Sequence, residues 1–292
     1  MKKYQTFISS EELFELKKSG HVVTIDCRFD LSNPDWGYSD YLKNHIPNAI
    51  YAHLDHDLSK SITPSSGRHP LPDTGEFIDT CSKWGIDSQK QVVVYDTASG
   101  SFAARLWWML HYLGHSNVAI LNGGFAAWIE KDYPVESGDM KPTQNSEPSS
   151  FTGKPDPLML VTTAEMEEII HRNDYTIIDA RSPERYSGET EPIDTKAGRI
   201  PNSINFFHQE NFDQSGYLLP ESELKQKYEQ LLQGKSKENI VVYCGSGVTS
   251  AMNVAVMKHI HMDTPKLYLG SWSEWIRDPN HPIINDYLSN NQ

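Results

Sequence analysis

Short apolar runs alternate along this chain with longer segments in which apolar residues recur at helical spacing. Helical patterns begin near Ser10 and Thr163, and hydroxyl side chains suit helix N-termini because they accept bonds from free backbone N–H groups. Four runs rich in β-branched residues predict short buried strands, at residues 22–28, 91–96, 175–181 and 239–244. The alternation predicts an α/β fold in which each domain has a mainly parallel sheet flanked by helices.

The same order of segments occurs twice in the sequence. VVTIDCR matches YTIIDAR, NHIPNAI matches GRIPNSI, QVVVYD matches NIVVYC, and LNGGFAAW matches YLGSWSEW. The offset of about 150 residues indicates a duplicated domain, because stacked repeats recur every 20 to 50 residues or so.

The stretch between the two halves, which begins at Ser137, is rich in Ser, Pro and Gly and poor in apolar residues. That composition is typical of a linker. We therefore expect a first domain at residues 1–137, a linker at 138–157 and a second domain at 158–292.

Composition narrows the range of partners. Among the 292 residues, 26 Lys and Arg stand against 39 Asp and Glu, which gives a formal charge of −13. Such a surface repels nucleic acids and anionic membranes, so neither is an expected partner.

Lys2 and Lys3 are followed by no apolar stretch, no run reaches transmembrane length, and the three cysteines show no metal-ligand spacing. These features favour a cytoplasmic protein with free thiols.

One cysteine occupies a chemically distinctive position. Cys244 ends an apolar run and is followed by GSGVTS and a helical pattern. Gly245 and Gly247 let backbone N–H groups point inward, and the helix start adds positive potential, so the loop can hold a negative sulfur and lower the pKa of the thiol. A lone cysteine is often a buried inert thiol, and we predict that role for Cys27 and Cys81, which lack this setting.

The CGSGVTS loop resembles the active-site loop of the rhodanese superfamily, specifically of its tandem-domain 3-mercaptopyruvate sulfurtransferases. Further matches are the HIP and RIP segments, WWMLHYLGH, LNGGFAAW and GSWSEW, which together span almost the whole chain. The resemblance implies two rhodanese-like domains of which only the second is catalytic. In agreement, Asp96 stands in the first half where Cys244 stands in the second.

The resemblance also ranks the sulfur donors. Relatives that prefer thiosulfate follow the cysteine with basic residues, whereas Gly245 and Ser246 stand here, so 3-mercaptopyruvate is expected first and thiosulfate second. Arg185 matches the family's substrate-binding arginine, and a guanidinium can bind a carboxylate bidentately, although a surface salt bridge is the alternative. No Arg stands at the place of the family's second substrate-binding arginine, for which Lys196 and Arg199 are candidates.

Other site residues follow from the same resemblance. Ser246 matches a hydroxyl beside the sulfur, and His69 and Asp55 match first-domain residues that assist it in moving a proton. The alternatives are a turn hydrogen bond for Ser246, a loop position for His69 and a capping role for Asp55. The residues expected to bind substrate around the sulfur are Gly245, Ser246, Gly247, Val248 and Thr249.

The expected chemistry is a two-step sulfur transfer. The Cys244 thiolate takes sulfur from the donor, releases pyruvate and passes the sulfur to cyanide, a small thiol or a thioredoxin-like dithiol, with no metal or organic cofactor. A cysteine phosphatase is a rival reading, but it needs an arginine six residues after the cysteine, where Ser250 stands. The other rival is a non-enzymatic sulfur-carrier or regulatory module.

Overall fold

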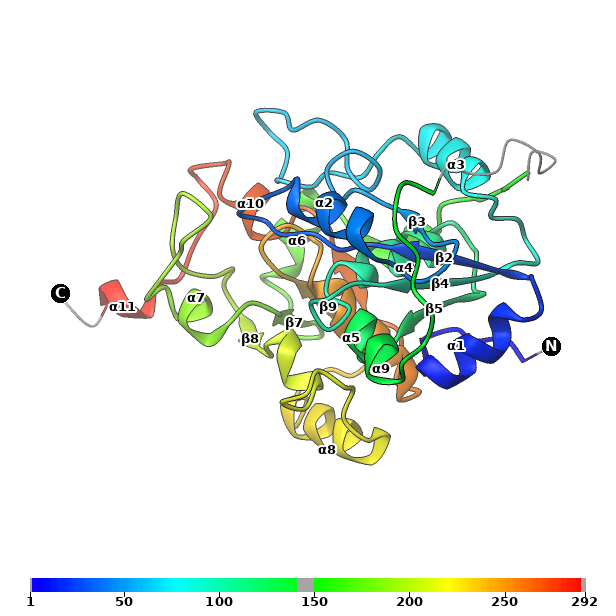
Figure 1. The fold of residues 1–292 in the computed structure, drawn as a ribbon. Helices are drawn as coiled ribbons and strands as arrows, with labels where there is room; N and C mark the ends of the chain where they lie inside the picture. Colours follow the sequence, from blue (N-terminus) through cyan, green and yellow to red (C-terminus); the bar gives the residue numbers. More distant parts are fainter. Residues whose placement is uncertain (1, 141–149, 290–292) are drawn as a thin grey trace. The chain divides into compact units, whose positions relative to one another are not determined.

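A computed structural model describes residues 2–140 and 150–289 (Figure 1). The chain forms two compact units, and both are discontinuous in sequence. Unit 1 consists of Met1–Lys60, Leu71–Asp156 and Phe212–Leu218, and unit 2 consists of Ser61–Pro70, Pro157–Asn211 and Leu219–Gln292. Each half of the sequence thus gives one short segment to the other unit. Within the predicted linker, residues 141–149 lie outside the described residues.

Unit 1 is built on a five-stranded sheet in which every neighbouring pair is parallel. The strand order is β1-β5-β4-β2-β3. The strands are β1 (Phe7–Ile8), β2 (Val22–Asp26), β3 (Ile50–Tyr51), β4 (Gln91–Tyr95) and β5 (Val118–Leu121). The helices are α1 (Ser10–Lys17), α2 (Trp36–Lys43), α3 (Thr74–Lys83), α4 (Ala103–Tyr112) and α5 (Gly124–Glu130).

Unit 2 repeats this arrangement with strand order β6-β10-β9-β7-β8, again all parallel. The strands are β6 (Leu160–Val161), β7 (Thr176–Asp179), β8 (Ser203–Asn205), β9 (Ile240–Tyr243) and β10 (Lys266–Tyr268). The α-helices are α6 (Thr163–Ile169), α7 (Pro183–Ser187), α8 (Glu221–Leu231), α9 (Ser250–His259), α10 (Ser271–Trp275) and α11 (Asp286–Ser289). Two 3-10 turns complete it, η1 (Pro157–Met159) and η2 (His208–Asn211).

The two strand orders are the same once the second set is renumbered, so the predicted duplication and the α/β fold are both confirmed. The four central strands are buried along almost their full length. Such strands read as continuous apolar runs because helices cover both faces of a parallel sheet. This explains why sequence pattern alone located them.

The first helix of each half begins with a capping box. Ser9 caps α1 and Thr162 caps α6, and each side chain accepts a bond from the backbone of the Glu three residues later. The sequence had placed these starts at Ser10 and Thr163, which are the first helical residues. A cap residue lies just before the first helical residue, so the observed caps precede the predicted ones by one position.

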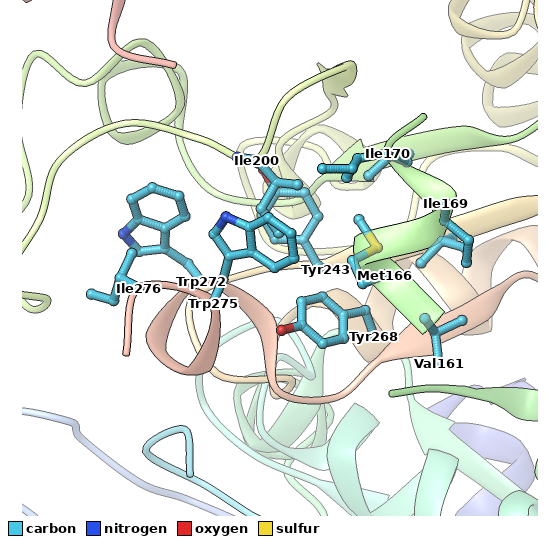
Figure 2. Packing of buried hydrophobic residues seen from close by; sticks show 12 residues of the cluster. Val161, Met166, Ile169, Ile170, Ile200, Tyr243, Tyr268, Trp272, Trp275 and Ile276 are labelled. Atoms are coloured by element: carbon cyan, nitrogen blue, oxygen red, sulfur yellow. Dashed lines mark hydrogen bonds between the residues drawn. The ribbon is translucent and has the colours of Figure 1, made fainter. Parts of the chain in front are cut away.

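The core of unit 2 holds the helix that follows β10. Trp272 and Trp275 of α10 are fully buried among apolar side chains of α6 and the sheet. Figure 2 shows the two indole rings at one end of the cluster in this view and Val161, Met166 and Ile169 at the other. Burial of these rings stabilises the position of α10, against which the Cys244 loop packs.

Among residues 2–140 and 150–289, no helix combines the length and the apolar character needed to cross a lipid bilayer.

Candidate active site

Cys244 follows directly after β9, the middle strand of the unit 2 sheet, and the loop after it leads into α9. Its backbone is fixed on both sides. The Cys244 N–H donates to the Ser271 hydroxyl at 3.1 Å, and the Trp272 N–H donates to the Cys244 carbonyl at 3.0 Å. The thiol therefore lies at the carboxyl end of a central parallel strand, where α/β sheets bind their ligands.

The loop needs glycine at one position for two reasons. Gly247 has φ +72°, in the left-handed region, and a Cβ built there would lie 2.3 Å from the carbonyl oxygen of Leu269. A side chain would therefore strain the backbone and collide with the segment before α10.

Hydrogen bonds hold negative charge on the Cys244 sulfur. Burial by itself raises the pKa of this thiol, but bonds from the Ser250 and Thr249 side chains and from the backbone N–H groups of Ser246 and Ser250 outweigh burial. The pKa of Cys244 is therefore lowered from its ordinary value of 9.0. The Ser250 Oγ lies 3.3 Å from Sγ. Because the thiolate is the nucleophilic form, the loop activates this residue.

In unit 1, the loop equivalent to the Cys244 loop surrounds the carboxyl group of Asp96 with backbone N–H donors. The Asp96 side chain accepts four backbone N–H bonds of 2.7–2.9 Å, from Ala98, Gly100, Phe102 and Ala103. In both loops the same two backbone N–H groups donate, those of the second and sixth residues after Asp96 or Cys244. Their acceptor is the Asp96 carboxyl group in unit 1 and the Cys244 sulfur in unit 2. In each unit the loop thus directs backbone N–H groups at one acceptor side chain, and in unit 2 that side chain carries a sulfur.

The two other cysteines differ from Cys244 in their electrostatic setting. Cys27 and Cys81 are buried, and burial raises the pKa of both thiols. For Cys27, nearby carboxylates including Asp26 and Asp96 raise the pKa further. Both side chains are therefore protonated near neutral pH and poor nucleophiles.

Two of the predicted proton-handling residues come together in unit 2. The Nδ1 of His69 lies 2.7 Å from the Ser246 Oγ, and both residues are buried. His69 reaches this position because Ser61–Pro70 belongs to unit 2. Asp55 belongs to unit 1, and its part in proton transfer stays a prediction.

Arg185 lies beside the loop and is held by two carboxylates. Its Nε and Nη2 donate to Glu191 at 2.7–3.1 Å, and Nη2 also reaches Asp194 at 3.3 Å. A Cβ built on Gly245 would lie 3.4 and 3.6 Å from its two terminal nitrogens, so the guanidinium stands directly over this residue. Arg181, four residues earlier, is buried in an ion pair with Asp179.

Of the two candidates for a second cation, Arg199 has its guanidinium in other contacts. Arg199 forms a bidentate ion pair with Asp286 at 2.6 and 2.8 Å and lies over the Tyr186 ring. The backbone carbonyl of Lys196 accepts a bond from the Trp272 indole.

Sequence reasoning missed three residues of the site. The sequence pointed to Ser250 only as the residue that stands where a phosphatase needs arginine, although its spacing from Cys244 was the available signal. Arg68 precedes His69 directly, and Ser271 aligns with Gly124 of the repeat. Among the described residues, His, Cys, Asp and Glu side chains form no group of three able to hold a metal ion.

Comparison with known proteins gives a consistent picture. The rhodanese-like domain family matches residues 9–131 and 162–278. A probable 3-mercaptopyruvate sulfurtransferase of Pseudomonas aeruginosa is 38% identical over 278 residues, which cover 94% of this chain and 96% of that protein. A putative thiosulfate sulfurtransferase, SseB, of Mycobacterium tuberculosis is 35% identical over 287 residues, with 96% of each chain covered.

A solved structure shows the same architecture. The 3-mercaptopyruvate sulfurtransferase of Leishmania major matches with a TM-score of 0.79 and 32% identity, over 93% of this chain and 74% of that one. The resemblance indicated by the CGSGVTS loop is thereby confirmed. Two matched rhodanese-like domains, a shared strand order and one cysteine-bearing loop show that this chain belongs to the rhodanese superfamily, in its tandem-domain form.

Proposed function

We propose that this chain is a sulfurtransferase that moves sulfane sulfur from 3-mercaptopyruvate to a thiophilic acceptor through a persulfide on Cys244. The observation that carries the proposal is the set of hydroxyl and backbone N–H donors around Sγ, which lowers the pKa of the thiol. The name of the Pseudomonas aeruginosa relative supports the choice of donor.

The first step breaks the carbon–sulfur bond of the donor. The Cys244 thiolate attacks the donor sulfur, and the electron pair of the broken bond passes to the pyruvate enolate, which takes up a proton. Ser246 and His69, joined at 2.7 Å, are the groups that we assign to this proton transfer, with Asp55 as an assisting residue. The product on the protein is a persulfide, whose negative outer sulfur the backbone N–H groups of the loop stabilise.

Arg185 has the role of holding the donor's carboxylate. Its guanidinium lies over Gly245, and its Nη1 has no hydrogen-bond partner among the described residues. In the second step an acceptor thiolate or cyanide attacks the outer sulfur and restores the Cys244 thiolate. A small thiol or a thioredoxin-like dithiol in the cytoplasm fits this step, because the reaction needs a reducing thiol pool.

Thiosulfate is the second candidate donor. The Mycobacterium tuberculosis relative is named a putative thiosulfate sulfurtransferase, and two guanidinium groups lie within 4 Å of a Cβ built on Gly245. The loop itself carries no charge, however, and a compact dianion gains most from charge placed in the loop beside the sulfur. We therefore keep 3-mercaptopyruvate as the preferred donor.

The decisive test replaces the nucleophile. In Cys244→Ser, pyruvate release from 3-mercaptopyruvate with cyanide as acceptor should fall by roughly four orders of magnitude, because no persulfide can form. The control is Cys81→Ser, a buried thiol whose loss should leave turnover near that of the unmodified chain. Mass spectrometry of the unmodified chain should find one added sulfur on Cys244 after donor is supplied. Normal pyruvate release by Cys244→Ser would refute the proposal.

A further inference from the structure

A second guanidinium stands beside the loop, and it comes from a segment remote in sequence. Arg68 lies on Ser61–Pro70, which belongs to unit 2. A Cβ built on Gly245 would lie 2.7 Å from Nη2 of Arg68, closer than the 3.4 Å to Nη2 of Arg185. The residue that follows the nucleophile is thus covered by two arginines.

One carboxylate links the two arginines. Asp194 accepts bonds from Nε and Nη2 of Arg68 at 2.9 and 3.2 Å and from Nη2 of Arg185 at 3.3 Å. The Asp194 side chain is only 4% exposed, whereas that of Arg68 is 19% exposed. Asp194 therefore fixes the position of both guanidinium groups from the buried side.

The backbone of Arg68 is also fixed to unit 2. Its N–H donates to the Ser273 hydroxyl at 3.0 Å, and the preceding Gly67 N–H donates to Glu274 at 3.2 Å. Since α10 carries both acceptors, the arginine is held by the same helix that fixes the backbone of Cys244. The Nη1 of Arg68 has no hydrogen-bond partner in the part of the chain that the structure describes.

An anionic donor needs a local positive site on this chain. The formal charge of −13 repels anions, and the loop residues after Cys244 are uncharged. Fixed guanidinium groups are well suited to this task, because their planar donors match carboxylate oxygens and lose little freedom on binding.

We infer that Arg68 is the second guanidinium that binds the anionic group of the sulfur donor, and that it sets donor specificity together with Arg185. This inference rests on the proposed function for the identity of the donor. Arg68 takes the role that the sequence suggested for Lys196 or Arg199, and the guanidinium of Arg199 pairs with Asp286 instead.

The first experiment tests for positive charge near the Cys244 sulfur and does not depend on sulfur transfer. Cys244 is alkylated with iodoacetate, which is anionic, and with iodoacetamide, which is neutral, and the site is verified by mass spectrometry. In Arg68→Met the iodoacetate rate relative to the iodoacetamide rate should fall about 5- to 10-fold, and Arg68→Lys should restore part of it. The control is Arg172→Met, because Arg172 is an exposed arginine of unit 2 that pairs with Asp174. An unchanged ratio in Arg68→Met would overturn the inference.

The second experiment separates this inference from the proposed function. With 3-mercaptopyruvate as donor, Arg68→Met should raise KM about 10-fold or more, while kcat at saturating donor and the Cys244 persulfide persist. A normal KM in Arg68→Met beside an active unmodified chain would remove Arg68 from the donor site and leave the proposed function intact. If Arg199→Met raised KM instead, the role would pass to Arg199. If the unmodified chain formed neither pyruvate nor persulfide, the proposed function itself would fail, while the alkylation ratio would still report on Arg68.

Discussion

At the scale of single residues, the chemistry of Cys244 depends on a hydroxyl six positions further along the chain. Ser250 is the first residue of α9, so its side chain and its backbone N–H both face the sulfur. Its side-chain hydrogen bond is the largest of the contributions that lower the pKa of the thiol. Burial acts against it, so the balance is sensitive to the loss of one donor.

Ser250→Ala should therefore raise the pKa of Cys244, since the variant loses a hydrogen bond to a charged group, which is worth about 1.5 kcal/mol or more. A lowered pKa means more thiolate below pH 9, so the variant should need a higher pH to reach the same rate of alkylation by iodoacetamide. The pH profile of that rate measures the shift. Ser187→Ala, in which an exposed hydroxyl is removed, is the control and should keep the original profile. Superimposable profiles for Ser250→Ala and the unmodified chain would show that the hydroxyl has no such role.

At the scale of elements, the loop between β9 and α9 depends on close contact with the segment after β10. Gly247 and Gly234 have nearly the same φ, +72° and +71°, but only Gly247 faces a neighbouring carbonyl, whereas a Cβ on Gly234 would meet nothing within 4 Å. The two glycines lie in the same unit. Substitution of alanine at each of the two glycines therefore separates two losses of stability. One comes from a Cβ on a left-handed backbone, and the other from the collision of that Cβ with a neighbouring carbonyl.

Gly234→Ala should cost about 1 kcal/mol of local stability, because the left-handed conformation disfavours a Cβ. Gly247→Ala should cost clearly more, since the methyl group would have to displace the carbonyl of Leu269, and it should also slow alkylation of Cys244. Hydrogen exchange of unit 2 amides measures both local stabilities. Equal losses in the two variants would mean that the loop relaxes freely and that close packing does not shape it.

At the scale of the whole molecule, unit 2, which carries Cys244, is assembled from both halves of the sequence. The hydrogen bonds of His69 to Ser246 and of Arg68 to Asp194 join residues 177 and 126 positions apart. Gly67 permits this approach, because a Cβ there would lie 2.8 Å from the carbonyl oxygen of Gly270 and 2.9 Å from the Ser273 hydroxyl.

Gly67→Ala should displace Arg68 and His69 from the loop and lower kcat/KM for 3-mercaptopyruvate by roughly 10- to 100-fold, although the substitution is remote from Cys244 in sequence. The matched control is Ile62→Ala in the same segment, where the side chain is 58% exposed and its loss should have little effect. Steady-state kinetics on both variants provide the measurement. If both behave alike, then the position of this segment is not what the reaction requires.

The sequence by itself determined the architecture of the fold and singled out Cys244 as the candidate nucleophile. Buried parallel strands and their following helices leave local, periodic patterns, and the duplication showed each pattern twice. Cys244 was recognisable for the same reason, because a strand end, two glycines and a helix start are adjacent in the chain.

Only the tertiary structure added Ser250 and Arg68 to the hydroxyl and charged groups that the resemblance had placed near that sulfur. Arg68 and its carboxylate partner Asp194 lie far apart in sequence, and a loop arginine has no local pattern that separates a binding residue from a surface ion pair. The sequence also did not show that Ser61–Pro70 belongs to unit 2. The predicted domain boundaries followed composition, whereas the two units are defined by contacts between residues. Local sequence patterns reveal the secondary structure that residues adjacent in the chain favour. The site, in contrast, is formed by residues that come into contact only after folding.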